Sequence, residues 1–163
     1  MVEHDAVMEV VGGAFHPQRG TFFLVQDRVP GTASERNLVA EIDPVTGQVL
    51  ASFQTTQANP AFTVNYGDLE VSPHGNLLIV SSVQSVIGQF TTLGAWVQGH
   101  PLPAGVASLC GIGLDASGCG LWVASTSGPV FALAATCPTA VTYGSGCPSS
   151  GGSNTLTAAS LPW

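Results

Sequence analysis

Short stretches in which apolar and polar residues alternate, or in which apolar residues run together, follow one another along most of the chain. Three of them share one layout: an alternating segment, a tight turn that ends in glycine, and a nearly continuous apolar segment. The turns end at Gly20, Gly75 and Gly118. Glycine readily adopts the positive φ angle that closes such a turn, and two strand-like segments joined this way are typical of a β-hairpin. The pattern therefore predicts three hairpins.

Each hairpin is followed by two more strand-like segments. They lie at 37–42 and 48–53, at 85–90 and 95–97, and at 129–133 and 140–143. Four short antiparallel strands at a spacing of about 40–50 residues are typical of propeller blades. No segment keeps an uninterrupted helical period over three turns, so we expect almost no helix. The sequence predicts an all-β fold, a partial or open β-propeller-like array of about three four-stranded antiparallel blades with an extended C-terminal tail.

The predicted boundaries follow from the repeats. We expect a repeat domain at 1–143, followed by a Gly/Ser/Thr-rich uncharged tail at 144–163. Within the repeat domain the expected units are 10–54, 66–98 and 109–143. Propellers typically close with four to eight blades, so three blades leave the array open.

Several of these turns resemble those of a known superfamily. The segment GIGLDASG at 111–118, followed by LWVAS at 121–125, is similar to the repeat of NHL-type and related secreted bacterial β-propellers. VSPHG at 71–75 and IDPVTGQV at 42–49 resemble turns of the same superfamily. YGSGCP at 143–148 resembles a segment that opens C-terminal modules in some multidomain secreted bacterial proteins. The resemblance implies the fold and leaves activity open, because such propellers include binding scaffolds, lyases and lactonases.

Charge is scarce and unevenly placed. The chain has three arginines, no lysine and ten carboxylates, giving a formal net charge of −7, so it cannot supply the basic stripe that nucleic acid requires. No apolar run approaches the ~20 residues of a membrane span. Residues 116–163 contain no charged residue and no histidine. This stretch fits a secreted tail of biased composition, burial against another copy, or O-linked glycans, since no Asn-x-Ser/Thr sequon is present.

The cysteines indicate the compartment. All four lie in the last third of the chain, and none forms a Cys-x-x-Cys pair: Cys110, Cys119, Cys137 and Cys147. We expect two disulfides and therefore an extracellular or cell-surface location, with free thiols or a metal site as alternatives.

The expected hairpin limits the disulfide pairing. If the turn is 115–118, Leu114 faces Cys119, and Cys110 lies about four residues, or ~13 Å, from Cys119 along the strands. A disulfide needs Cα atoms within about 7 Å, which disfavours this pair. The next strand returns Cys137 to the edge that carries Cys119. The predicted bridges are Cys119–Cys137 and Cys110–Cys147.

Few residues point to catalysis. Asp68 and Glu70 lie two apart on an expected innermost strand, so they share a face. With Asn65 they could bind a divalent cation, as carboxylates and an asparagine do in lactonase-like propellers; one blade, however, cannot supply the six or so oxygens that calcium prefers.

His16 and His74 fall in repeat turns, where we expect them to face solvent. Nucleophile-elbow and phosphate-loop motifs are absent. We expect no catalytic residue, no metal and no cofactor.

Two functions remain open. The first is a non-enzymatic extracellular scaffold, structural or binding, that self-associates. The second is a fragment of a propeller lactonase- or lyase-like metal-dependent enzyme.

Core-type side chains are expected on the uncovered blade faces: Phe22, Leu24, Leu121 and Trp122. Contact between two such different faces closes a ring or continues as a filament, and residues 9–11 and 154–161 could add strands to a neighbour. We expect a homo-oligomer, and a fibre rather than a closed ring.

Overall fold

The computed structural model describes residues 10–27, 37–115, 118, 120–136 and 161–162, which form three sheets. Sheet 1 contains β1 (Val10–His16), β2 (Thr21–Gln26), β3 (Leu38–Ile42) and β4 (Val49–Gln54). Sheet 2 contains β5 (Asp68–Val71), β6 (Leu77–Val80), β7 (Val86–Phe90) and β8 (Trp96–Pro101). Sheet 3 contains β9 (Leu109–Leu114), β10 (Gly120–Ser125), β11 (Val130–Thr136) and the two-residue β12 (Leu161–Pro162). The one described helix, α1 (Thr55–Ala58), is a single turn.

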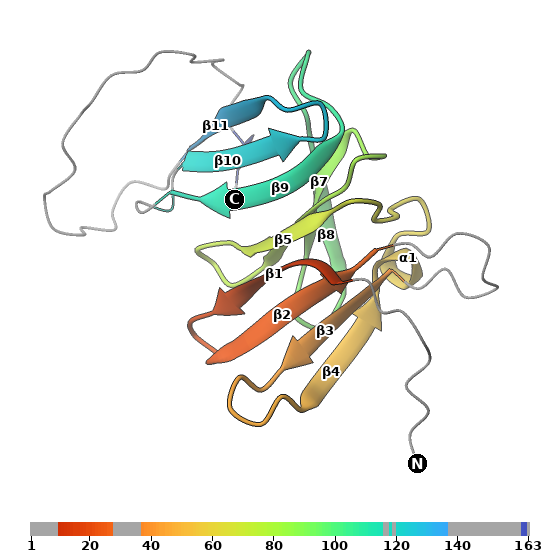
Figure 1. Ribbon diagram of the computed structural model, residues 1–163, viewed down its shortest axis with the longest axis vertical. Helices are drawn as coiled ribbons and strands as arrows, with labels where there is room; N and C mark the ends of the chain where they lie inside the picture. Colours follow the sequence, from red (N-terminus) through yellow and green to blue (C-terminus); the bar gives the residue numbers. More distant parts are fainter. Residues whose placement is uncertain (1–9, 28–36, 116–117, 119, 137–160, 163) are drawn as a thin grey trace, which may run out of the picture.

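The sheets follow one another as blades. Within each sheet, consecutive strands pair antiparallel, apart from β11 and β12. The first strands of the three sheets, β1, β5 and β9, lie in a row, with β5 between the other two (Figure 1). Sheet 2 therefore has sheet 1 on one face and sheet 3 on the other. This arrangement confirms the predicted all-β, partial propeller-like array with almost no helix.

The turns of the three hairpins have the predicted geometry. Gly20, Gly75 and Gly118 have φ angles of 69°, 80° and 70°. In each turn the glycine N–H donates to the carbonyl three or four residues earlier, at 2.9 Å. A β-carbon would strain the backbone at such φ angles, so these glycines set where each hairpin reverses.

The register of the third hairpin differs from the expectation. Leu114 pairs with Leu121, and Asp115 N–H donates to Gly120 O at 2.8 Å. The pairing is therefore shifted by two residues from the predicted pair of Leu114 and Cys119, and it matches the first hairpin, in which Phe15 pairs with Phe22. The prediction resumed pairing directly after the turn glycine, whereas the first described bond across the hairpin after that glycine is at Gly120.

The edge of sheet 3 also differs in part from the expectation. The strand expected at 140–143 lies outside the described residues. Beside the end of β11, Ala135 pairs with Leu161 in β12, and this pairing is parallel. Two parallel strands need a long connection between them, so the hairpin pattern that predicted the other strands could not predict β12.

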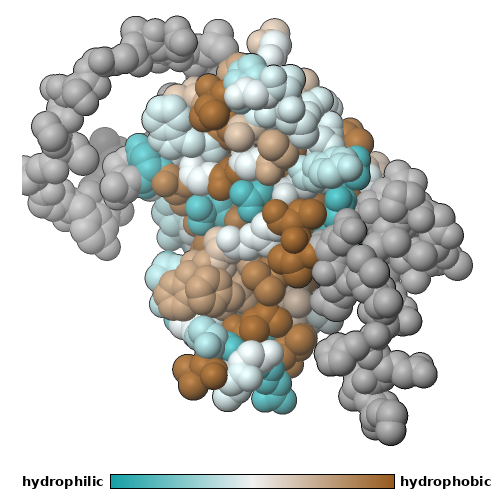
Figure 2. All heavy atoms as spheres, in the orientation of Figure 1, coloured by the Kyte–Doolittle hydropathy of each residue, from teal (hydrophilic) through white to brown (hydrophobic). Residues whose placement is uncertain are grey.

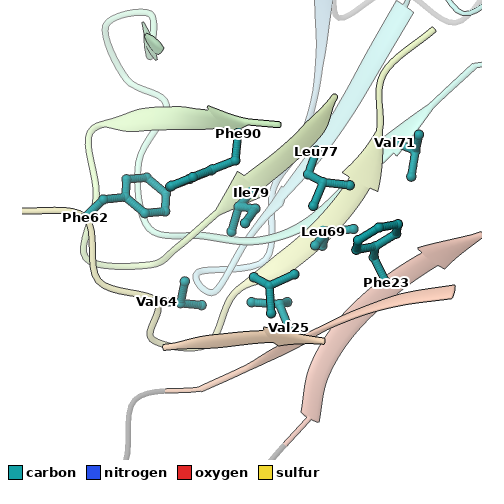
Figure 3. Close-up of a cluster of buried hydrophobic side chains, with 10 residues drawn as sticks. Phe23, Val25, Phe62, Val64, Leu69, Val71, Leu77, Ile79 and Phe90 are labelled. Atoms are coloured by element: carbon teal, nitrogen blue, oxygen red, sulfur yellow. The ribbon is translucent and has the colours of Figure 1, made fainter. Parts of the chain in front are cut away.

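Two apolar cores lie between the sheets. The first joins sheets 1 and 2 and includes Phe62 and Val64 from the connection before β5; ten buried residues form it, nine of which are labelled in Figure 3. The second joins sheets 2 and 3 and is formed by Leu78, Val80, Ile87, Val106, Leu109, Leu121, Val123 and Leu133. In β6 all four residues are buried, because both faces of this strand are covered.

Candidate functional site

The two acids proposed as metal ligands hydrogen bond to neighbouring backbone. Asp68 Oδ2 accepts a hydrogen bond from Ile112 N–H of β9 at 3.1 Å, and Oδ1 accepts one from Leu69 N–H at 2.8 Å. A further bond comes from Gly13 N–H of β1. The innermost strands of all three sheets therefore meet at the carboxylate of Asp68. Burial raises its pKa above the ordinary value, and the backbone donors oppose that rise.

Glu70, two residues further along β5, also accepts hydrogen bonds from neighbouring backbone N–H groups. Its Oε1 accepts a hydrogen bond from Val71 N–H at 2.8 Å, and its Oε2 accepts a longer one from Leu114 N–H at 3.4 Å. Asn65 is held by its backbone: its N–H donates to Ser81 Oγ at 2.9 Å, and its carbonyl accepts from Ser82. Among the described residues no three His, Cys, Asp or Glu side chains come close enough to hold a metal ion. At their inner edges β1 and β9 have no paired strand, and the acids of β5 accept hydrogen bonds from N–H groups on those edges.

The equivalent positions of the other two sheets carry small residues. Where sheet 2 has Asp68 and Glu70, sheet 1 has Gly12 and Ala14, as the pairing partners on the second strands show. A β-carbon at Gly12 would collide with the side chain and Cα of Asp68, so β1 and β5 can approach closely only because this residue is glycine.

The expectation that both turn histidines face solvent is wrong for His16. Its side chain is buried, its ring lies 5.7 Å from that of Phe23, and its Nε2 is 3.1 Å from the carbonyl of Gly75. This contact joins the turn of sheet 1 to the turn of sheet 2. His74 is exposed, as expected. Stacking of successive turns buries His16, which sequence spacing could not show.

One ion pair links the first turn to β3. Glu41 is buried and accepts hydrogen bonds from Arg19 Nε at 2.7 Å, Arg19 Nη2 at 3.0 Å and Thr21 Oγ1 at 2.7 Å. The Arg19 guanidinium holds the pKa of Glu41 below its ordinary value. Glu41 also lines a hollow of about 100 Å³ between β3, β4 and the turn after β7, together with Phe23, Val39, Ala51, Ser52, Phe53, Thr92 and Leu93. Ligand pockets usually measure about 300–1,000 Å³, so this hollow is small for a substrate.

The predicted disulfides remain predictions. Cys110 is half-buried in β9 and is a free cysteine in the structure. Cys119, Cys137 and Cys147 lie outside the described residues. Peptide mapping under non-reducing conditions tests both pairings.

Large apolar side chains lie exposed on the face of sheet 1 that points away from sheet 2. Phe15, Phe22, Ile42 and Val49 form one row across the four strands, because each is the pairing partner of the next. Phe15 and Phe22 are 46% and 40% exposed, and their ring centroids are 5.2 Å apart. Figure 2 shows apolar surface gathered over β1–β4. We call this surface, with Val10, Gly13, the half-buried Leu24 and Leu38, and the buried Ala40 between them, the sheet 1 free face.

The face of sheet 3 that points away from sheet 2 differs in surface shape from the sheet 1 free face. Trp122 is 51% exposed and pairs with Gly113 and Ala132. The next row consists of Gly111, Ala124 and Val130. We call this surface the sheet 3 free face. A single large ring stands among small side chains here. Of the residues expected on open faces, Phe22, Leu24 and Trp122 lie there, whereas Leu121 is buried against sheet 2.

The sequence and structure comparisons give a likeness of fold. No family model and no curated protein matches the sequence. A protein of unknown function from Bacteroides caccae aligns with a TM-score of 0.52 and 14% identity, over 77% of this chain and 42% of that one. A catalytically inactive virginiamycin B lyase from Staphylococcus aureus gives 0.51 and 15%, over 85% and 44%.

A third solved structure agrees with these two. Kuenenia stuttgartiensis hydrazine synthase gives a TM-score of 0.51 and 12% identity, over 83% of this chain and 40% of that one. The chain therefore spans less than half the length of each of these neighbours. Identities this low establish fold alone. The structural neighbours are β-propeller-type folds, and this chain has the architecture of part of such a propeller.

Proposed function

We propose that this chain is a non-enzymatic extracellular scaffold, structural or binding, that self-associates through its uncovered blade faces. The observation that carries the proposal is the sheet 1 free face, on which two phenylalanines and two aliphatic residues lie in one row, all exposed except the half-buried Ile42. Large contiguous apolar patches are rare on soluble monomers and usually mark interfaces. The likeness of the repeats to NHL-type and related secreted propellers fits this proposal.

The alternative is a fragment of a lactonase- or lyase-like enzyme. It would need Asn65, Asp68 and Glu70 to turn oxygens toward a metal. The two carboxylates already accept hydrogen bonds from Leu69, Ile112, Val71 and Leu114 N–H groups, and turning them toward a metal would break bonds to these part-buried donors. We therefore favour the scaffold.

The native mass of the chain tests the proposal. Sedimentation velocity at micromolar concentration should give species larger than the 16.6 kDa of one chain, with a mass that rises with concentration. A single species of one-chain mass would contradict self-association. Calorimetric titration with Ca²⁺ and Zn²⁺, together with metal analysis of the purified protein, should show no stoichiometric binding; a stoichiometric metal lost in a Glu70→Gln variant would favour the enzyme.

Deleting residues 148–163 separates two routes of association. If blade faces join the copies, the deletion should leave the assembly intact. If terminal strands exchange between copies, the deletion should weaken it, because a strand added to a neighbour's edge depends on main-chain hydrogen bonds from that segment.

A further inference from the structure

The three sheets use equivalent positions for contact with their neighbours. Phe22, Leu77 and Leu121 are equivalent, because each lies one step in from the pair or bond that closes its hairpin turn. They pair with Phe15, Val71 and Leu114 respectively. Leu77 and Leu121 face the preceding sheet and are at most 1% exposed, whereas Phe22 is 40% exposed. The sheet 1 free face is thus the face that sheets 2 and 3 use to receive the sheet before them.

The opposite faces are equivalent in the same way. Phe23, Leu78 and Trp122 occupy the next position along each strand. Phe23 and Leu78 pack against the following sheet and are at most 1% exposed, whereas Trp122 is 51% exposed. The sheet 3 free face is therefore the face that sheets 1 and 2 present to the sheet after them. The two free faces are the two halves of an interface that occurs twice within the chain.

The relief of the two free faces is complementary. On sheet 3 the Trp122 ring stands between Gly113 and Ala132, and a β-carbon at Gly113 would meet no atom within 4 Å. On sheet 1 the row beside the phenylalanines contains Gly13, Leu24 and Ala40, and the Leu24 side chain covers Gly13. A single ring on one surface and a row of smaller residues beside two phenylalanines on the other allow close packing.

Charge is nearly absent from the two free faces. The chain has a net charge of −7, yet the rows that form the sheet 1 free face contain only apolar residues, glycine and uncharged polar residues, and the sheet 3 free face has one charged residue at its border, Asp115, whose carboxylate lies beside Gly120. Charge on a surface keeps copies of a protein apart, but one carboxylate opposite an uncharged face adds no like-charge repulsion to their contact.

We propose that the sheet 1 free face of one copy packs against the sheet 3 free face of a second copy, with Trp122 inserted beside Phe15, Phe22 and Leu24 of that copy. This inference rests on the proposed self-association and specifies its partner and geometry. The contact continues the blade-to-blade stacking found within the chain. It joins two different surfaces, so it is heterologous and leads to a closed ring or a filament.

Two charge-introducing variants test the pairing. Phe22→Glu disables only the sheet 1 free face, and Trp122→Glu disables only the sheet 3 free face. Both residues are exposed, so both variants should fold with circular dichroism and thermal stability close to the original protein. Val83→Glu is the matched control, because Val83 is 54% exposed in the turn between β6 and β7, away from both free faces.

Mixing the two variants separates the possible contacts. Each variant alone should remain monomeric, with association at least about 30-fold weaker than in the original chain. An equimolar mixture should form a species of twice the 16.6 kDa chain mass and nothing larger, because one intact pair of faces remains. Val83→Glu should assemble like the original protein.

Other outcomes overturn the pairing in distinguishable ways. If Trp122→Glu alone still forms dimers and Phe22→Glu does not, two sheet 1 free faces meet each other, and the converse result means that two sheet 3 free faces meet. If both variants assemble like the original chain, association uses another surface, so the pairing fails while the proposed self-association stands. If the original chain is monomeric, the proposed function itself fails.

Discussion

The boundary between sheets 1 and 2 and the boundary between sheets 2 and 3 are formed by side chains of different chemistry. At the first boundary the core is rich in aromatic rings: Phe62, Phe90 and Trp96 lie within 5.1–5.5 Å of one another, measured between ring centroids. At the second boundary the buried core residues are all leucine, isoleucine or valine. There the acids of β5 add hydrogen bonds to the backbone of β9.

The difference shows how one strand serves two neighbours. Leu69 and Val71 of β5 face sheet 1, whereas Asp68 and Glu70 bond to the backbone of sheet 3, and Asp68 also accepts one hydrogen bond from Gly13 N–H of sheet 1. Aromatic rings bury large areas and favour tilted or edge-on contacts, so the first boundary can rely on packing. At the second boundary the exposed N–H groups of an edge strand also need acceptors, and the two carboxylates provide them. One boundary depends mainly on shape, and the other depends in part on charge and protonation.

The largest effect is expected at the aromatic boundary. Phe90→Ala removes a ring that is fully buried and contacts Phe53, Phe62 and Trp96. We expect a loss of about 3–5 kcal/mol in the free energy of unfolding, because the truncation leaves a cavity. The matched control is Phe22→Ala, which makes the same change on a free face and should cost under about 1 kcal/mol in dilute protein. Urea unfolding measures both; equal losses would contradict the assigned burial.

A pH series distinguishes the buried Glu41 from the half-buried Asp68. The pKa of Glu41 is lowered by Arg19, so its contribution to stability is present above its ordinary pKa of 4.5 and is lost as the pH falls through the folded value. The pKa of Asp68 is raised by burial above its ordinary 3.8, so its contribution is fully present below that value and is lost as the pH rises through the folded value.

The measurement compares each acid with its amide. The difference in unfolding free energy between the original protein and Glu41→Gln should shrink by about 1–2 kcal/mol as the pH falls from 6 to 3, roughly the value of a charge-assisted hydrogen bond. The corresponding difference for Asp68→Asn should grow over the same range. Two differences that change in the same direction would contradict the assignment of pairing to one acid and desolvation to the other.

The smallest effect is expected at Glu70. Its bond to Leu114 N–H is 3.4 Å long, close to the limit for a hydrogen bond, and its other oxygen binds locally to Val71 N–H. Glu70→Gln keeps one acceptor oxygen, so it should cost about 0.5–1 kcal/mol or less. Amide exchange should become faster at Leu114 and stay unchanged at Ile112, which bonds to Asp68. Faster exchange at both amides would mean that the two acids act as one unit.

Local sequence signals predicted the blades well. Alternation and turn glycines such as Gly20 and Gly75 identify each hairpin, because strand pairing across a short turn involves only neighbouring residues. The third register could not be read the same way. Gly118 marks a turn, but the sequence does not state how many residues follow it before pairing resumes at Gly120.

The roles of the candidate site residues depended on contacts between sheets. Asp68 meets Ile112, which is 44 residues away in the sequence, and His16 meets Gly75, which is 59 residues away. Which backbone donor lies opposite a carboxylate depends on how the sheets stack, and residue spacing along the chain carries no such information. The spacing correctly put Asp68 and Glu70 on the innermost strand of sheet 2, and the free faces followed from the open array.

Sheet 2 carries both halves of the blade interface on a single stretch of chain, with Leu77 on one face and Leu78 on the other. A segment with this property can be copied in tandem at the level of the gene, and each copy would find a matching surface before it and another after it. The number of blades can then change by duplication or loss of a segment while the contacts between neighbouring blades stay the same. The number of blades that complete a circle depends on the angle between successive sheets.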